Sequence, residues 1–137
     1  MGLIILMPWL YENEIFEGPR DYWGFVYEIV DTVNNRKYIG KKQFYFRKTK
    51  ILKGKKKRIL VDSDWKTYFG SNLELNEQVK LHGEEKFVRN IIKLCKSKSE
   101  CTYWEAKIQF QCDVLLSEEY YNGWISAKVT KKHLLKK

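Results

Sequence analysis

Two tyrosines, a lysine and a glutamate are the residues of this sequence whose types suit chemistry on a phosphate. Tyr27 ends the apolar run FVY, and Tyr38 begins a second run, YIG, which Lys41 follows directly. Glu105 stands much further along, in TYWEAK. A phenolic oxygen can activate water, a cation can hold a phosphate, and a carboxylate can bind a divalent metal. The set therefore suits cleavage of a phosphodiester bond.

Each of these residues also has a purely structural interpretation. Tyr27 and Tyr38 could be half-buried strand aromatics, but the adjoining IGKK favours a catalytic role. Glu105 could pair with a lysine on a helix surface. Its apolar neighbours make an idle carboxylate costly, which favours a metal ligand.

The histidines and cysteines suit other chemistries poorly. His82 ends a polar segment and His133 lies in a lysine-rich tail, so we interpret both as solvated. Cys95, Cys101 and Cys112 lack the spacing of zinc ligands. We expect them to be reduced thiols in or near the core of a cytoplasmic protein.

The charge of the chain indicates a polyanionic partner. Lys and Arg outnumber Asp and Glu by 26 to 17, a formal net charge of +9, and such an excess attracts nucleic acid. Residues 41–58 include ten basic residues and no acidic one, which favours a nucleic-acid surface over a merely solvated loop. Beyond Lys41, the phosphate contacts that we predict are Lys42, Lys48, Lys53, Lys55, Lys56, Lys57 and Arg58.

Patterns along the chain predict a small α/β (α+β) domain whose antiparallel or mixed sheet has about three strands flanked by helices. Residues 22–30 and 37–40 are rich in β-forming side chains around Asn34-Asn35, which predicts a β-hairpin. Side chains alternate in face along a strand, so Tyr27 and Tyr38 are expected on one face as cross-strand neighbours. Residues 86–95 predict a third strand.

Three helical segments and one irregular segment complete the expected fold. A short turn is expected between Ser63 and Gly70, a helix before Gly83, and the main core-packing helix within residues 97–116. Residues 41–61 are expected to form a long loop or an irregular helix-loop segment.

The length of 137 residues fits one domain. We divide the chain into an N-terminal arm (1–20), a nuclease-like domain (21–125) and a basic tail (126–137). The start, MGLIILMPWLY, has no basic region before its apolar patch and no cleavage site, so a secretion signal is not expected. No apolar run approaches the length of a bilayer span.

From about residue 22 to residue 124, the motifs resemble the GIY-YIG nuclease family. FVY stands where the family has GIY, with Phe25 at the position of the motif's glycine, and YIG matches the second half. KYIGKKQF and DSDWKTYFGS also resemble small phage endonucleases of the Seg type. Five features in the expected order make the resemblance specific.

The resemblance implies a role for each motif residue. Tyr27 would take a proton from the attacking water, with Tyr38 as a relay, and Lys41 would stabilise the phenolate. Glu105 would bind one Mg²⁺, for which Mn²⁺ could substitute. Arg47 would hold the phosphate, with Lys48 or Arg58 as substitutes, and Gly40 and Asn122 would support the site.

The resemblance also implies a function, a divalent-metal-dependent DNA endonuclease that acts on double-stranded DNA. Its location would be the cytoplasm, and the host cytoplasm if a phage encodes it. One active site cuts one strand, so a double-strand break would need a homodimer, a higher homo-oligomer or two encounters. A non-catalytic nucleic-acid-binding module on the same fold, or a nuclease acting on RNA, stays open as an alternative.

Overall fold

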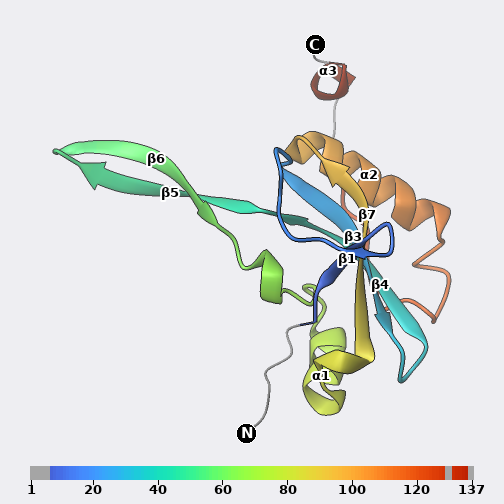
Figure 1. Ribbon diagram of the computed structural model, residues 1–137. Coiled ribbons are helices and arrows are strands. Elements are labelled where there is room, and N and C mark those ends of the chain that lie inside the picture. The colour runs from blue at the N-terminus through green and yellow to red at the C-terminus, as the bar shows by residue number, and fades with distance from the viewer. Residues whose placement is uncertain (1–6, 129–130, 136–137) are drawn as a thin grey trace, which may run out of the picture.

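A five-stranded mixed sheet forms the centre of the computed structural model, which describes residues 7–128 and 131–135 (Figure 1). The strand order is β2-β1-β7-β3-β4. The bounds are β1 (Trp9–Tyr11), β2 (Glu14–Ile15), β3 (Gly24–Asp31), β4 (Arg36–Gln43) and β7 (Phe87–Cys95). The α+β prediction is confirmed, and β4 lies at the edge of the sheet.

The predicted hairpin is present as β3 and β4. Its turn is held by Asp31, whose carboxylate accepts hydrogen bonds from the backbone amides of Val33 and Asn34 at 2.9 and 3.0 Å. In the antiparallel register Tyr27 is opposite Gly40, and Tyr38 is opposite the residue two positions after Tyr27. The two tyrosines therefore share one face of the sheet as diagonal neighbours.

The sheet exceeds three strands because residues 9–15 add two more. β1 runs parallel to β7, with Trp9 beside Arg89, and β2 folds back antiparallel on β1. The indole of Trp9 is buried and donates to the carbonyl of Trp65 at 2.6 Å. Both strands lie within the predicted arm of residues 1–20, of which residues 1–6 lie outside the described part of the chain.

Two hydrophobic clusters cover the two faces of the sheet. One joins the β3 side chains Phe25 and Tyr27 to α1, and the other joins Val26 to Cys101 of α2. The helical elements are η1 (Trp65–Thr67), α1 (Leu73–His82), η2 (Glu84–Lys86), α2 (Lys98–Gln111) and α3 (Lys131–Leu134). α3 lies in the predicted basic tail, part of which falls outside the described residues.

Local signals define the ends of the two main helices. Asn72 accepts a hydrogen bond from the amide of Leu75 at 2.9 Å, and Ser97 accepts one from the amide of Glu100 at 3.1 Å. Both are N-caps, which satisfy amides that the first helical turn leaves unpaired. Gly83, with φ of 92°, ends α1 as predicted. α2 ends at Gln111, five residues before the end of the predicted segment.

The prediction for residues 41–61 was wrong. Residues 41–43 belong to β4, and β5 (Tyr45–Leu52) and β6 (Lys55–Asp62) pair along their whole length in a separate two-stranded sheet. Lys53 and Gly54 form the turn with φ of 51° and 74°, the two positive values that a tight type I′ hairpin turn needs. We call residues 45–62 the basic hairpin, and it projects from the body of the molecule (Figure 1).

The three cysteines are free thiols, with Cys95 and Cys101 buried and Cys112 half-buried, as predicted for thiols in or near the core. Within the described residues, no helix has the length and apolar character that a bilayer span requires.

Candidate active site

A cavity of about 360 Å³ lies beside the edge strand β4 and contains several of the predicted residues. We call it the pocket. Its walls come from four parts of the chain that are distant in sequence. The lining residues are Tyr38 and Lys41 of β4, Ser71 and Asn72 before α1, Glu105 and Gln109 of α2, and Asn122, Gly123, Trp124 and Ser126. The last four belong to residues 117–126, which we call the C-terminal segment.

The edge position of β4 explains how side chains from both faces of the sheet reach one cavity. Successive side chains of a strand point to opposite faces, so Tyr38 lies on the face covered by α1 and Lys41 on the face covered by α2. Inside a sheet, neighbouring strands would separate them. At the edge both border the same space, where the ammonium of Lys41 lies 3.4 Å from the carboxylate of Glu105.

The C-terminal segment pairs with the first half of β4 and leaves the second half open. Tyr121 donates its amide to the carbonyl of Lys37 at 2.7 Å. The Asn122 side chain then accepts from the amide of Ile39 at 3.0 Å and donates to its carbonyl at 2.8 Å. The pocket begins where this pairing ends, beside Lys41. Asn122 thus forms one wall by binding the backbone of β4.

Tyr27 lies behind the pocket, against Gly40. Its side chain is 1% exposed, and its ring centroid is 6.2 Å from that of Tyr38. A Cβ atom on Gly40 would lie 2.7 Å from Cζ of Tyr27 and 3.0 Å from Cε2 of Tyr38. Only glycine lets the two rings pack this closely over β4, which explains the glycine of YIG. Phe25, at the position of the first motif's glycine, packs fully in the core.

Burial controls the protonation of the site. Burial raises the pKa of Tyr27 well above its usual value, and the neighbouring Tyr68 and Tyr38 raise it further. Burial also raises the pKa of Tyr38, against the opposing effect of its 3.0 Å hydrogen bond to Ser71. Both phenols are therefore neutral at pH 7. Burial raises the pKa of Glu105 as well, and Lys41 partly offsets this.

One buried side-chain atom of the pocket has no hydrogen-bond partner within the described residues. Gln109 is buried, and its amide nitrogen donates to the carbonyl of Ile39 at 2.9 Å. Its Oε1 accepts no hydrogen bond. Gln109 lies one helical turn after Glu105, so both residues present an oxygen from the same side of α2. The described residues contain no cluster of three or more histidine, cysteine, aspartate or glutamate side chains.

Comparison with known proteins assigns the chain to a family. The family model described as "Putative endonuclease segE, GIY-YIG domain" matches residues 9–125. The chain belongs to this GIY-YIG family. A curated relative, "Putative endonuclease segE" of Enterobacteria phage T4, is 30% identical over 98 residues, which are 72% of this chain and 39% of that protein. This chain therefore matches about two fifths of the relative's length. No solved structure gives a significant match.

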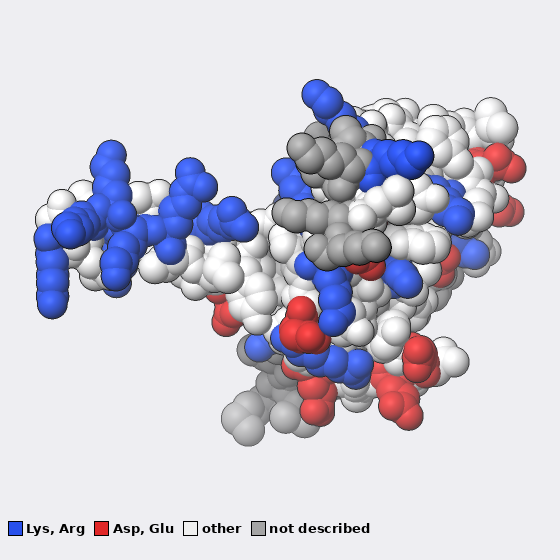
Figure 2. All heavy atoms as spheres, turned by 90° about the horizontal axis from the view of Figure 1, so that it is seen from above, with Lys and Arg blue, Asp and Glu red and all other residues white. Residues whose placement is uncertain are grey.

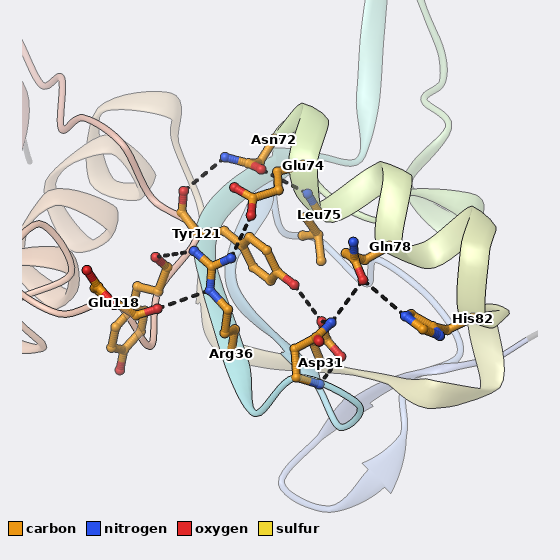
Figure 3. Close-up of polar contacts among 11 residues, drawn as sticks. Asp31, Arg36, Asn72, Glu74, Leu75, Gln78, His82, Glu118 and Tyr121 are labelled. Atoms are coloured by element: carbon orange, nitrogen blue, oxygen red, sulfur yellow. Dashed lines mark hydrogen bonds and ion pairs between the residues drawn. The ribbon is translucent and has the colours of Figure 1, made fainter.

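A polar network behind the wall of this GIY-YIG pocket fastens the C-terminal segment (Figure 3). The hydroxyl of Tyr121 donates to the carboxylate of Asp31 at 2.5 Å, and the guanidinium of Arg36 lies 3.9 Å from the centre of the Tyr121 ring. Arg36 also pairs with Glu74 of α1 at 2.7 Å. Burial raises the pKa of Asp31, but hydrogen bonds from Tyr121 and from the turn outweigh it and leave the pKa below its usual value.

The remaining residues predicted from the GIY-YIG motifs lie outside the pocket. Arg47 is exposed on β5, six residues beyond Lys41, and does not line the cavity. Lys42 is half-buried, pairs with Asp64 at 2.6 Å and lies 4.1 Å from the centre of the Tyr68 ring. The other predicted phosphate contacts are exposed on the basic hairpin: Lys48, Lys53, Lys55, Lys56, Lys57 and Arg58.

Six residues that line the pocket were not predicted from the sequence: Ser71, Asn72, Gln109, Gly123, Trp124 and Ser126. Gln109 could have been found from its spacing, because a residue four positions after Glu105 shares its helix face. Ser71 follows Gly70 in the segment between β6 and α1. It can hydrogen-bond Tyr38 because this segment passes beside β4 in the folded chain. No local pattern marks that contact.

Proposed function

We propose that the chain is a divalent-metal-dependent endonuclease that hydrolyses phosphodiester bonds of double-stranded DNA. The observation that carries the proposal is the convergence of Tyr38, Lys41 and Glu105 on one cavity at the edge of β4. These residues supply a phenol and a cation from β4 and a carboxylate from α2, two elements that are distant in sequence. Membership of the GIY-YIG family supports the reaction class.

A divalent metal fits the oxygen donors of the pocket. Mg²⁺ is usually held by one or two carboxylates and keeps several waters, and Glu105 offers one carboxylate that is 14% exposed. The unpartnered Oε1 of Gln109 is a hydrogen-bond acceptor for such a water. Glu105 would hold Mg²⁺, with Mn²⁺ as a substitute. When bound, the ion would stabilise the negative charge that develops on the phosphate and the leaving oxygen.

Tyr38 and Ser71 provide a path for the proton of the attacking water. The water oxygen forms a bond to phosphorus as the bond to the leaving oxygen breaks. The water gives its proton to Oη of Tyr38, which passes its own proton to Ser71, 3.0 Å away. Ser71 is exposed and releases a proton to solvent, and the leaving oxygen gains one from water. A neutral tyrosine can serve in this way because it gives up a proton as it accepts one.

Tyr27 is then a positioning residue rather than the group that contacts the water. It does not line the pocket, and its ring packs against Gly40. Lys41 contacts the phosphate directly in this arrangement, since its ammonium borders the cavity. Arg47, Lys48 and Arg58 contact DNA phosphates further along the duplex.

A plasmid-nicking assay tests this function. The purified chain is incubated with supercoiled plasmid in Mg²⁺, in Mn²⁺ and in EDTA. We expect relaxed circles with either metal and none in EDTA. A chain that binds duplex DNA but gives no relaxed product with either metal would overturn the endonuclease proposal. In that case the chain would be a nucleic-acid-binding module on the same fold.

A further inference from the structure

The basic hairpin is the part of the molecule that the chemistry of the pocket leaves unexplained. None of residues 45–62 lines the pocket. From Arg47 to Arg58 the basic hairpin, a two-stranded ribbon, has eight basic side chains and no acidic one. Figure 2 shows these side chains along the projecting arm, with acidic side chains only near its base.

One cross-strand pair destabilises the basic hairpin when no partner is bound. Lys50 lies directly opposite Lys57, and like charges opposite each other destabilise an antiparallel pair. A two-stranded ribbon without other packing is marginally stable in water. Ile51 and Leu60 are 68% and 63% exposed, so apolar contacts do little to compensate. A polyanion bound along the ribbon would remove the repulsion.

The root of the hairpin is nevertheless firmly fixed. Phe44, just before β5, is fully buried and packs 5.1 Å from Trp65 between ring centroids. The amide of Ser63, just after β6, donates to the carbonyl of Phe44 at 2.8 Å. Lys42 and Asp64 pair across the same root. The ribbon is therefore held at a set direction from the body rather than attached through a loose linker.

We propose that the basic hairpin inserts as a two-stranded ribbon into the major groove of B-form DNA. This inference rests on the proposed function for its partner, duplex DNA. The major groove of B-DNA is wide enough to admit a two-stranded β-ribbon. The deep, narrow major groove of an RNA duplex is not accessible to side chains.

The distribution of cations over both faces of the ribbon favours insertion into the groove over flat contact with the DNA backbone. One face presents Arg47, Lys56 and Arg58, and the other presents Lys48, Lys50, Lys55 and Lys57. A ribbon that lay on one strand would use one face only. A ribbon within a groove has phosphates on both sides. The exposed Ile51 and Leu60 are then available for apolar contacts with thymine methyl groups.

The ribbon also sets a distance between the groove contact and the pocket. β4 carries Lys41 and continues through Phe44 directly into β5. Lys50 lies nine positions after Lys41, and at about 3.3 Å per residue this stretch spans at most roughly 30 Å. This length is close to one turn of B-DNA, about 34 Å. The ribbon would therefore contact the major groove within about one turn of the bond that the pocket cleaves.

Binding measurements on matched duplexes test the groove insertion. The full chain is titrated, by fluorescence anisotropy in EDTA, into a 20-base-pair DNA duplex, the same sequence as an RNA duplex, and a DNA duplex with bulky groups on pyrimidine C5, which faces the major groove. We expect the plain DNA duplex to bind at least tenfold more tightly than either of the others. Equal affinity for all three duplexes would overturn the insertion.

A charge-neutralising variant and its control test whether the basic hairpin causes the preference for plain DNA. The double variant Lys50→Gln, Lys57→Gln should lose the preference for plain DNA, and its plot of log K against log salt should flatten by about 1.8, at about 0.9 per phosphate contact. The control Lys80→Gln, Lys86→Gln removes two exposed lysines of α1 and η2 and should keep the preference. A control that loses as much preference as the ribbon variant would also overturn the proposal.

Plasmid nicking separates this inference from the proposed function. A chain that nicks plasmid but binds plain and C5-blocked duplexes equally would support the endonuclease proposal and exclude the groove insertion. A chain that discriminates between these duplexes but never nicks plasmid would support the groove insertion and exclude the endonuclease proposal.

Discussion

The basic hairpin follows directly after β4, the edge strand of the pocket, yet the two regions place their charges in opposite environments. In the pocket, the charges of Lys41 and Glu105 are largely buried and paired with each other. On the hairpin, the cations are exposed, and Lys50 faces another cation across the ribbon. Chemistry needs groups held at set distances, which packing provides. Capture of a polyanion needs charge that is free to meet phosphates.

The difference extends to how each region is held in place. The pocket depends on side chains that bind backbone, such as Asn122 on Ile39. The hairpin depends on its own ladder of backbone hydrogen bonds and on a fixed root at Phe44 and Trp65. Substitutions in the pocket should therefore change rate or folding. Substitutions on the hairpin should change binding and its salt dependence.

The largest effect is expected from Glu105→Gln. The change removes the carboxylate that would hold the metal, so cleavage should fall by about a thousandfold or more, because metal stabilisation of the transition state contributes several kcal/mol. The stability of the fold should not decrease. Burial raises the pKa of Glu105 above its unfolded value, so the ionised group costs stability at pH 7. The variant should show an equal or higher Tm, together with lost nicking.

The control for this change is Glu77→Gln, an exposed glutamate of α1. It should leave both nicking and Tm unchanged. In the parent at Mg²⁺ concentrations far below saturation, the acid limb of the rate profile should lie at higher pH than for an ordinary glutamate, because burial raises the pKa of Glu105 and the group must be ionised to bind metal. Full activity of Glu105→Gln would exclude the metal site.

The second effect concerns the two tyrosines. Tyr38→Phe removes the hydroxyl that lines the pocket and should lower the nicking rate by about a hundredfold or more, the usual contribution of a proton-transfer group. Tyr27→Phe should lower it less, because that hydroxyl does not line the pocket. DNA affinity in EDTA should stay within about twofold for both variants, since neither change alters charge.

The order of the two rates decides which tyrosine contacts the water. Tyr103→Phe, at an exposed tyrosine of α2, serves as a control and should nick at the parent rate. If Tyr27→Phe is the slower of the two variants, Tyr27 is the proton acceptor and Tyr38 only passes the proton on.

The β3-β4 hairpin, β7 and the two main helices could be predicted from sequence because their signals are local, whereas β1 and β2 were missed. Alternating β-branched and aromatic residues around Asn34-Asn35 predict the β3-β4 hairpin, and Ser97 and Gly83 mark helix ends. The basic hairpin was missed because its strands are exposed on both faces and lack a buried stripe. Its usable signal was Lys53-Gly54 between two eight-residue runs that carry Ile51-Leu52 and Ile59-Leu60.

The site could be predicted only in part, because its geometry depends on the edge position of β4. The motifs YIG and TYWEAK indicated Tyr38, Lys41 and Glu105, which converge in the pocket. The sequence does not show that β4 is an edge strand, since that follows from the order of all five strands. The binding of Asn122 to the β4 backbone and the contact of Ser71 with Tyr38 depend on the same long-range order.

The third effect concerns close packing at Gly40. Gly40→Ala adds a methyl group 2.7 Å from Cζ of the buried Tyr27 ring. The ring or β4 must move, and overpacking of this kind costs about 1–3 kcal/mol. Urea unfolding should show the loss, and nicking should fall with it because Tyr38 moves too. Gly18→Ala meets no atom within 4 Å and should leave both unchanged.

A partial rescue would localise the clash. The double variant Gly40→Ala, Tyr27→Phe lacks the hydroxyl nearest to the added methyl group and should recover some of the lost stability. Failure of Gly40→Ala to lower stability at all would contradict the tight packing of Tyr27 over β4.

The fourth effect is an acid-dependent loss of stability through Asp31. Its folded pKa lies below its unfolded value of about 3.9. Its stabilising effect is therefore present above pH 4 and lost as the pH falls through the folded pKa. Asp31→Asn should lower the free energy of unfolding by about 2 kcal/mol at pH 7, because the amide offers only one acceptor oxygen and no negative charge to Tyr121 and the amides of the turn.

Urea unfolding at pH 7 and pH 3 measures this effect. The gap between Asp31→Asn and the parent should shrink at pH 3. Asp21→Asn, which breaks an exposed ion pair with Lys96, should change stability little at either pH. A gap that stays constant with pH would show that the Asp31 carboxylate is not held in its ionised form by Tyr121.

The smallest effect on folding, and the sharpest contrast with the pocket, is expected from Lys57→Glu. The new carboxylate lies opposite Lys50, so an opposite-charge pair replaces a like-charge pair and the free hairpin becomes more stable. Hydrogen exchange of the β5 and β6 amides should slow, while Tm changes by no more than a few degrees. DNA binding should weaken and its salt slope flatten, because a phosphate contact has become a repulsion. Lys57→Gln, which only removes the charge, should lie between the parent and Lys57→Glu in both measurements. If Lys57→Glu slowed exchange without weakening DNA binding, the hairpin would lie away from the DNA, and its charge would have no part in capturing the duplex.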